Sequence, residues 1–158
     1  MINTNRERTN VVLGKKNRVV WGQDYITDRL CGLDFHISPL SFYQVNRTQA
    51  ERLYRQAAVY AGLTGHETLL DLYCGTGTIG LSMAAQAKRV IGVEVVPSAV
   101  EDARKNAERN HITNAEFFVG KAEEVLPEKY EKEGIYADVI VVDPPRKGCE
   151  ESVLATMV

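Results

Sequence analysis

The chain has little of what secreted, membrane-spanning and metal-binding proteins are rich in. Its 158 residues include three cysteines, an odd number, which lie far apart and lack the spacing of metal ligands. No apolar run approaches the length of a membrane span, and residues 1–10 are polar rather than leader-like. We therefore expect a soluble, cytoplasmic chain with no leader, no disulfide framework and no bound metal.

The chain also lacks a strong net charge, which is −2 overall. Residues 1–29 nevertheless hold six Lys or Arg against three Asp or Glu, whereas the remainder holds thirteen against eighteen. A basic N-terminal part favours a polyanion partner, although ordinary surface charge on exposed strands explains it equally well.

The first forty residues have the pattern of short antiparallel strands. Runs of β-branched and aromatic residues alternate there with turn residues, which is typical of a hairpin or meander. We expect strands at residues 11–13, 19–21, 25–26 and 33–37, with a polar turn at 14–17.

At Asn46 the hydrophobic period changes to that of a helix. Asn46 with Gln49 predicts an N-terminal cap, and Gly62 stands where such a helix would end. Further on we expect helices at residues 78–86, 98–110 and 122–126, the second with a capping box of Ser98 and Glu101, and a solvated connection at 128–133.

The strands expected beyond this point alternate with those helices. They lie at residues 68–72, 89–93, 116–119 and 138–142. This order predicts an α/β fold, a parallel sheet of about four strands that is covered on both faces. So thin a sheet, with an uncovered edge, indicates a truncated fragment of a larger protein, and it leaves the oligomeric state unknown.

A glycine-rich turn follows the first of these parallel strands. Asp71 ends an apolar run, and Gly75 and Gly77 lead into a helical pattern, as in a ligand-binding turn. Glu94, which ends the next strand, suits ribose hydroxyls whether the ligand is a dinucleotide or S-adenosylmethionine. The carboxylate of Asp71 is unfavourable beside a diphosphate and favourable opposite a sulfonium and an amino group, so S-adenosylmethionine is the preferred ligand.

A second motif, Asp143-Pro144-Pro145-Arg146-Lys147-Gly148, follows the fourth parallel strand. Two prolines stiffen this loop and would hold Asp143 near the reactive end of a cofactor. Arg146 and Lys147 suit a phosphate backbone. An acidic-Pro-Pro loop at this place indicates methyl transfer to a planar base.

A third segment, residues 38–46, reads Ser-Pro-Leu-Ser-Phe-Tyr-Gln-Val-Asn. Its aromatic pair, Phe42 and Tyr43, and the amide of Gln44 suit stacking on an extruded base or an adenine ring. Taken alone, the segment is equally well a polar loop and a helix cap.

Together these motifs, in this order, closely resemble the RNA (uracil-5-)-methyltransferase family, whose members make 5-methyluridine in tRNA or rRNA. The resemblance spans about residues 10–158. It implies that residues 1–40 are the end of a β-rich central domain and that residues 41–158 are the N-terminal part of a Rossmann-like methyltransferase domain. It assigns Gln44, Tyr73, Glu94 and Asp143 to the S-adenosylmethionine site.

The resemblance also implies a mechanism and shows a departure from the family. In that family a cysteine thiolate adds to uracil C6, C5 is methylated, and a glutamate then removes the C5 proton. The motifs for that cysteine and glutamate are absent and are expected beyond residue 158. We therefore assign no catalytic residue to this chain, and we expect the fragment to be inactive.

The three cysteines present do not fill the gap. Cys149 follows the Asp-Pro-Pro loop, but its acidic neighbours Glu150 and Glu151 disfavour a thiolate. Cys31 and Cys74 are expected to be packed small residues. Two alternatives stay open: an N-methyltransferase that uses the Asp-Pro-Pro loop, and a non-catalytic module that binds cofactor or RNA.

Overall fold

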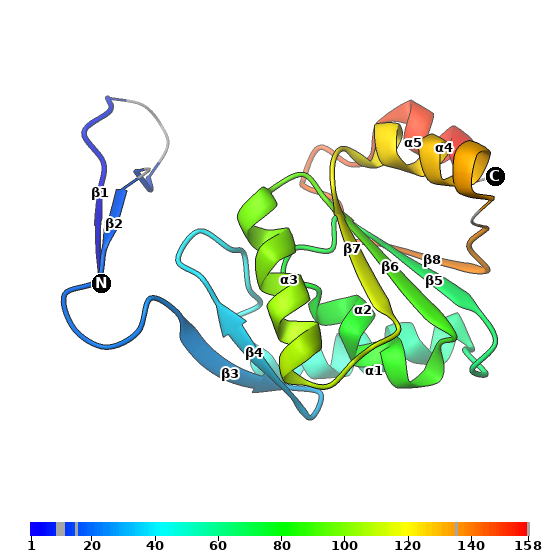
Figure 1. Cartoon of the computed structure of the whole chain (residues 1–158), viewed down its shortest axis with the longest axis horizontal. Coiled ribbons are helices and arrows are strands. Elements are labelled where there is room, and N and C mark those ends of the chain that lie inside the picture. The colour runs from blue at the N-terminus through cyan, green and yellow to red at the C-terminus, as the bar shows by residue number, and fades with distance from the viewer. Residues whose placement is uncertain (9–11, 15, 135, 158) are drawn as a thin grey trace.

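The computed structural model describes residues 1–8, 12–14, 16–134 and 136–157 (Figure 1). In these parts of the chain the elements run in the order β1 (Ile2–Thr4), β2 (Lys16–Arg18), β3 (Ile26–Leu30), β4 (Leu33–Ile37), α1 (Arg47–Ala61), β5 (Thr68–Leu72), α2 (Thr78–Met83), the 3₁₀ turn η1 (Ala84–Gln86), β6 (Arg89–Glu94), α3 (Pro97–Arg109), β7 (Ala115–Val119), α4 (Ala122–Glu133), β8 (Val139–Val142) and α5 (Glu151–Thr156).

Four strands form the parallel sheet, in the order β7-β6-β5-β8. β5 is central, so that Asp71 lies opposite Gly92 of β6 and Val141 of β8. The predicted parallel sheet is confirmed, and its strands begin and end within one residue of the expected positions. Because all four strands run the same way, their carboxyl ends share one edge of the sheet.

Side chains of successive strand residues point to opposite faces, and both faces are buried. On one face Leu69 and Val90 pack against Met83 and Ala84 of α2 and η1. On the other face Leu72 and its neighbours in the sheet pack with side chains of α4 and α5. Figure 1 shows this sandwich, with α1, α2 and α3 on one side of the sheet and α4 and α5 on the other.

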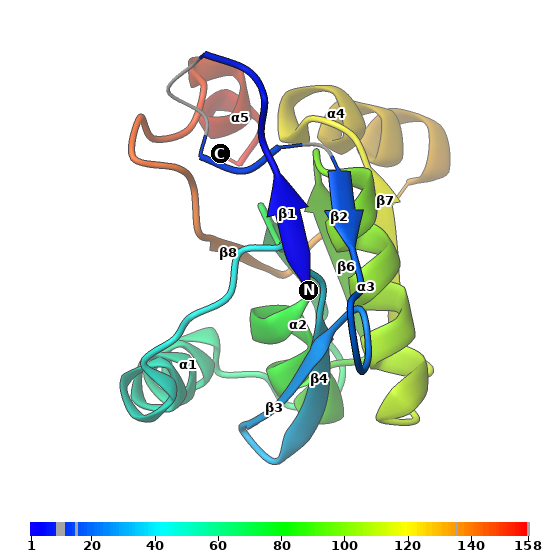
Figure 2. The ribbon, with the colours of Figure 1, turned by 90° about the vertical axis from the view of Figure 1, so that its left-hand side faces the viewer.

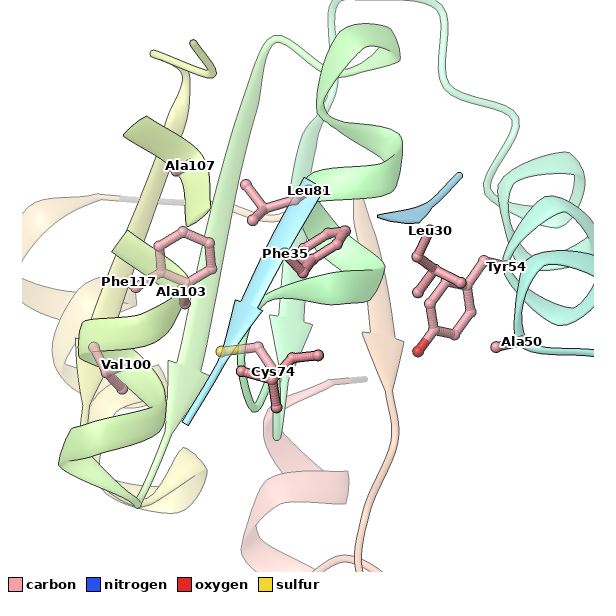
Figure 3. Close-up of a cluster of buried hydrophobic side chains, with 11 residues drawn as sticks. Leu30, Phe35, Ala50, Tyr54, Cys74, Leu81, Val100, Ala103, Ala107 and Phe117 are labelled. Atoms are coloured by element: carbon pink, nitrogen blue, oxygen red, sulfur yellow. The ribbon is translucent and has the colours of Figure 1, made fainter. Parts of the chain in front are cut away.

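The β3–β4 hairpin belongs to the core. Leu30 and Phe35 are fully buried and share a hydrophobic cluster with Tyr54 of α1, Val100 of α3 and Phe117 of β7 (Figure 3). The hairpin therefore packs against the helices on one face of the parallel sheet. The predicted boundary between two domains near residue 40 stays a prediction.

The β1–β2 hairpin differs from the predicted one. Residue 11 of the expected strand 11–13 lies outside the described residues, Val12 and Leu13 are not in a strand, and the expected strand 19–21 is absent. Instead β2 occupies residues 16–18, where a turn was predicted. Asn3 holds the hairpin together by exchanging two hydrogen bonds of 2.7 Å with Gly14, one from Nδ2 to the carbonyl and one from the Gly14 N–H to Oδ1. Trp21 is 91% exposed, so this apolar side chain is not part of the core.

Of the three helix boundaries predicted from a specific signal, the two of α1 are confirmed and that of α3 needs correction. Asn46 and Gly62 do cap α1: Asn46 Oδ1 accepts the Gln49 N–H, and Gly62 has a φ of 58°. The expected capping box of Ser98 and Glu101 is wrong, since α3 begins at Pro97 without a side-chain cap.

The connection predicted at 128–133 is also wrong, because α4 continues through Pro127 to Glu133. Proline removes one helical hydrogen bond and crowds the preceding turn, yet α4 accommodates Pro127 and continues beyond it. An ion pair of 2.9 Å between Lys132 and Glu128, four residues apart, supports the helix beyond the proline.

Candidate cofactor-binding site

A cavity of about 720 Å³ opens at the carboxyl edge of the sheet. Four of the segments that line it follow β5, β6, β7 and β8, and the fifth is the loop before α1. The lining residues are Phe42, Gln44, Tyr73, Gly75, Val93, Glu94, Val95, Gly120, Lys121, Ala122, Glu123, Asp143, Pro144, Pro145, Arg146, Lys147, Gly148 and Glu150.

Five of the predicted site residues line this cavity, although they are spread over a hundred positions in sequence. They are Gln44, Tyr73, Gly75, Glu94 and Asp143. Asp71 and Gly77 do not line it. Both lie underneath, where Gly77 packs against Phe117 and Asp71 is fully buried.

The glycine-rich turn is built from left-handed backbone. Tyr73, Gly75 and Gly77 have φ angles of 62°, 54° and 79°. Glycine adopts this conformation freely, but for tyrosine it costs about 1–2 kcal/mol. A residue other than glycine that is held in this conformation carries backbone strain. Here the strained residue is Tyr73, whose side chain faces the cavity.

Asp71 supports the turn from below. Its Oδ2 accepts the N–H of Gly80 in α2 at 2.8 Å, while Oδ1 has no hydrogen-bond partner among the described residues. Burial raises the pKa of this carboxyl to about 7; the Gly80 hydrogen bond opposes the rise, and the charges of Asp143 and Glu94 add to it. The sequence predicted that Asp71 would face the cofactor, and this stays a prediction.

Glu94 links the turn to the next helix. Its carboxylate accepts the N–H of Gly75 at 3.1 Å and the N–H of Val96 at 2.9 Å. Because Glu94 is the last residue of β6 and lines the cavity, its carboxylate is presented at the carboxyl edge of the sheet, and its predicted role towards ribose hydroxyls stays a prediction.

The loop after β8 forms the opposite side of the cavity. The Asp143 N–H donates to the Leu72 carbonyl at 3.4 Å, and Gly148 closes the loop by donating to the Pro145 carbonyl at 2.8 Å. The side chain of Cys149 in this loop lies close to the Tyr73 hydroxyl of the glycine-rich turn. Burial and the proximity of Cys149 raise the pKa of the Tyr73 hydroxyl.

Only one of the two aromatic residues expected to stack on a base lines the cavity. Phe42 does so and is 74% exposed. Tyr43 instead donates its hydroxyl to Asp28 Oδ2 at 3.1 Å, and burial and this hydrogen bond raise its pKa. The sequence offered no sign of this difference between neighbouring residues.

The cysteines agree with their predicted packing roles. Cys74 is buried in the glycine-rich turn, and desolvation, followed by the charges of Asp71 and Glu94, raises the pKa of its thiol. Burial also raises the pKa of Cys31, in the β3–β4 turn. A raised pKa disfavours the reactive thiolate.

Sequence reasoning missed the contribution of the segment after β7. Gly120, Lys121, Ala122 and Glu123 line the cavity, as does Val95 after β6. These residues carry no recognisable motif. Their position was nevertheless available, because every strand of a parallel sheet delivers its following residues to the same edge.

An open parallel sheet, a glycine-rich turn after its central strand and an acid at the end of the next strand define a Rossmann-like cofactor-binding domain. Residues 63–155 match the family described as methyltransferase domain, and the chain belongs to that family.

Individual relatives agree with this assignment. The chain is 55% identical to an uncharacterized RNA methyltransferase of Listeria innocua and 54% identical to one of Halalkalibacterium halodurans, in each case over 98% of this chain and 34% of the relative. It therefore spans about a third of the length of these curated relatives.

A solved structure is similar over the same extent. The tRNA (uracil-54, C5)-methyltransferase of Pyrococcus abyssi, in complex with S-adenosyl-L-homocysteine, matches with a TM-score of 0.80 and 34% identity. The match covers 98% of this chain and 36% of that one. The predicted Rossmann-like methyltransferase fold is thereby confirmed.

Proposed function

We propose that this chain forms the S-adenosylmethionine site of an enzyme that methylates C5 of a uridine in tRNA or rRNA. The observation that carries the proposal is the meeting of Gln44, Tyr73, Glu94 and Asp143 around one cavity. These are the four positions that the resemblance to uracil-C5 methyltransferases assigns to the cofactor. The RNA methyltransferase relatives and the Pyrococcus abyssi structure support the same activity.

The cavity fits S-adenosylmethionine in size and chemistry. Its volume of about 720 Å³ lies within the range of small-molecule sites. Gly75 places bare backbone at its floor, and Glu94 supplies acceptors for hydroxyl groups. The buried carboxyl of Asp71 leaves one oxygen without a partner among the described residues, and as the pH rises through its pKa of about 7 its developing negative charge favours a cationic ligand over a diphosphate.

When bound, this cofactor supplies an electrophilic methyl group. We assign the ribose hydroxyls to Glu94 and the methionine part to Tyr73 and the glycine-rich turn. Gln44 and Asp143 would stand between the cofactor and the uracil. The exposed guanidinium of Arg146, at the rim, suits an RNA phosphate.

A calorimetric titration tests the cofactor part of the proposal. The folded chain should bind S-adenosylhomocysteine and should not bind NAD, which presents a diphosphate to the same turn. Binding of NAD in preference to S-adenosylhomocysteine, or binding of neither, would contradict the proposal.

Incubation with RNA tests the remaining part. We expect no 5-methyluridine from this chain alone, because the family's cysteine and glutamate motifs are not among its residues. Mass spectrometry of digested tRNA and rRNA measures the product. Formation of 5-methyluridine would overturn the expected inactivity, and an N-methylated base would favour the N-methyltransferase alternative.

A further inference from the structure

Three polar side chains, two from α3 and one from the residue that caps its C-terminal end, form a ladder with the free edge of β4. They are Asp102, Asn106 and Asn110, whose four-residue spacing places them on one face of the helix. This face lies alongside β4, as Figures 1 and 2 both show. Each of the three side chains bonds to the backbone of one residue, and these residues are every second one along β4 and just beyond it. The ladder therefore takes the place of a neighbouring strand.

Two of the three ladder residues act as peptide mimics. Asn110 accepts the Asp34 N–H at 2.9 Å and donates to the Asp34 carbonyl at 2.8 Å. Asn106 does the same with His36, at 2.8 Å and 3.1 Å. An amide carries both a donor and an acceptor, which is what pairing with a strand residue needs.

Asp102 differs, because a carboxylate only accepts. Its Oδ2 accepts the Ser38 N–H at 3.1 Å and the Ser41 hydroxyl at 2.8 Å. The two serine hydroxyls lie 2.8 Å apart, and the Ser41 N–H donates to the Ser38 carbonyl at 3.2 Å. One carboxylate oxygen therefore fixes the turn at residues 38–41, directly before Phe42 and Gln44.

The same helix is tied to the other side of the cavity. α3 starts three residues after Glu94, whose carboxylate accepts the Val96 N–H. Further along, the Asn106 amide lies 3.5 Å from the Thr76 carbonyl in the glycine-rich turn. α3 thus contacts both the glycine-rich turn and the loop that carries Phe42 and Gln44.

We propose that Asp102 is a positioning residue, which sets the loop of Phe42 and Gln44 over the cofactor-binding cavity. It does not line the cavity and acts through the turn at residues 38–41. The proposal rests on the proposed function, since it takes the cavity as the cofactor site. It predicts that loss of this carboxylate oxygen changes the order of the loop more than it changes the stability of the fold.

Three variants of the chain test this assignment. Asp102→Ala removes the acceptor, Asp102→Asn keeps one acceptor oxygen, and Asn110→Ala removes an equivalent rung at the far end of the ladder. Hydrogen exchange of the amides in residues 38–46 reports on the loop, titration with S-adenosylhomocysteine reports on the site, and the thermal midpoint reports on the fold.

We expect Asp102→Ala to raise exchange in residues 38–46 and to weaken S-adenosylhomocysteine binding about tenfold, the equivalent of one hydrogen bond to a charged group. Asp102→Asn should restore most of both properties. Asn110→Ala should lower the thermal midpoint at least as much as Asp102→Ala and leave the loop and the binding unchanged.

The outcomes separate this proposal from the proposed function. If the unaltered chain does not bind S-adenosylhomocysteine, the proposed function fails, and loop exchange alone then decides the role of Asp102. Unchanged exchange in Asp102→Ala would overturn the positioning role. Equal loop exchange in Asp102→Ala and Asn110→Ala would overturn it as well, because the effect would then be a general loosening of the ladder.

Discussion

Two of the segments that line the cavity, the glycine-rich turn and the loop at residues 38–46, are held in place in different ways. The glycine-rich turn lies on the core: Asp71 and Leu72 beneath it are fully buried, and Cys74 is nearly so. The loop at residues 38–46 lies on the surface, where Phe42 is 74% and Val45 95% exposed. One segment is held by packing, whereas the other is held by a few polar contacts.

This difference has a consequence for mutation. A change in the turn must disturb buried atoms, so it should lower stability and binding together. A change at an exposed side chain of the loop, such as Phe42, removes few buried contacts, so it should alter binding without altering stability. The site thus joins a rigid part for the cofactor to an adjustable part on the side that we assign to the base.

The largest expected effect concerns the buried carboxyl of Asp71. Its pKa of about 7 in the folded chain lies roughly three units above the ordinary aspartate value, which corresponds to about 4 kcal/mol at most. Between those pKa values the folded chain holds a proton that the unfolded chain has lost. The stabilisation is therefore complete below about pH 4 and is lost as the pH rises through 7.

The variant Asp71→Asn should remove this pH dependence. Urea unfolding at pH 5 and pH 8 measures it: the native chain should lose stability relative to the variant as the pH rises. The difference between the two pH values is the informative quantity, because the buried amide has a constant cost of its own. A parallel pH dependence in both chains would contradict the buried, protonated carboxyl.

A smaller loss is expected for Gly92→Ala in β6, beneath the turn. An added Cβ would lie 2.4 Å from a ring carbon of Phe117 and 2.9 Å from the sulfur of Cys74. Overpacking of this kind costs about 3 kcal/mol when the neighbours are buried. Chemical denaturation measures the loss of stability.

Gly120→Ala is the matched control for Gly92→Ala. Its Cβ would also meet a carbon at 2.4 Å, but that carbon belongs to Val125, which is only half-buried and free to shift. We expect less than half the loss. Equal losses would mean that the packing beneath the turn is no tighter than at the edge of the cavity.

The sequence predicted which residues at the ends of the strands line the cavity better than which residues of the loop at 38–46 do so, for a physical reason. Tyr73, Glu94 and Asp143 each follow an apolar strand, and parallel strands bring such residues to one edge. The separation of Phe42 from Tyr43 depends on the position of Asp28, which no local pattern contains.

The same contrast explains the two N-terminal hairpins. β4 was predicted correctly because the burial of Phe35 and Ile37 follows the alternating pattern. β2 was missed because its three residues, Lys16 to Arg18, are polar and exposed, while Val20 and Trp21, apolar residues of the strand expected at 19–21, are exposed and lie outside any strand. An apolar run predicts a strand only where something packs on it.

Glu94→Gln should affect binding more than folding. The neutral amide keeps one acceptor for the backbone and loses the charge offered to ribose hydroxyls, so we expect about tenfold weaker binding of S-adenosylhomocysteine, or about 1.4 kcal/mol. Calorimetry measures the affinity. Glu123→Gln, another acid that lines the cavity, should have a smaller effect, and equal effects would remove the assigned role of Glu94.

The smallest effect on stability is expected for Phe42, in the exposed loop at residues 38–46. Phe42→Ala removes a side chain that is 74% exposed, so the free energy of unfolding should change by less than about 0.5 kcal/mol. Tyr43→Phe removes fewer atoms, but it removes the hydrogen bond to Asp28, so it should lower the free energy of unfolding by about 1 kcal/mol. Urea unfolding of both variants gives the order. If Phe42→Ala proved the more destabilising, the loop would be part of the core, and its adjustable role beside the packed glycine-rich turn would have to be abandoned.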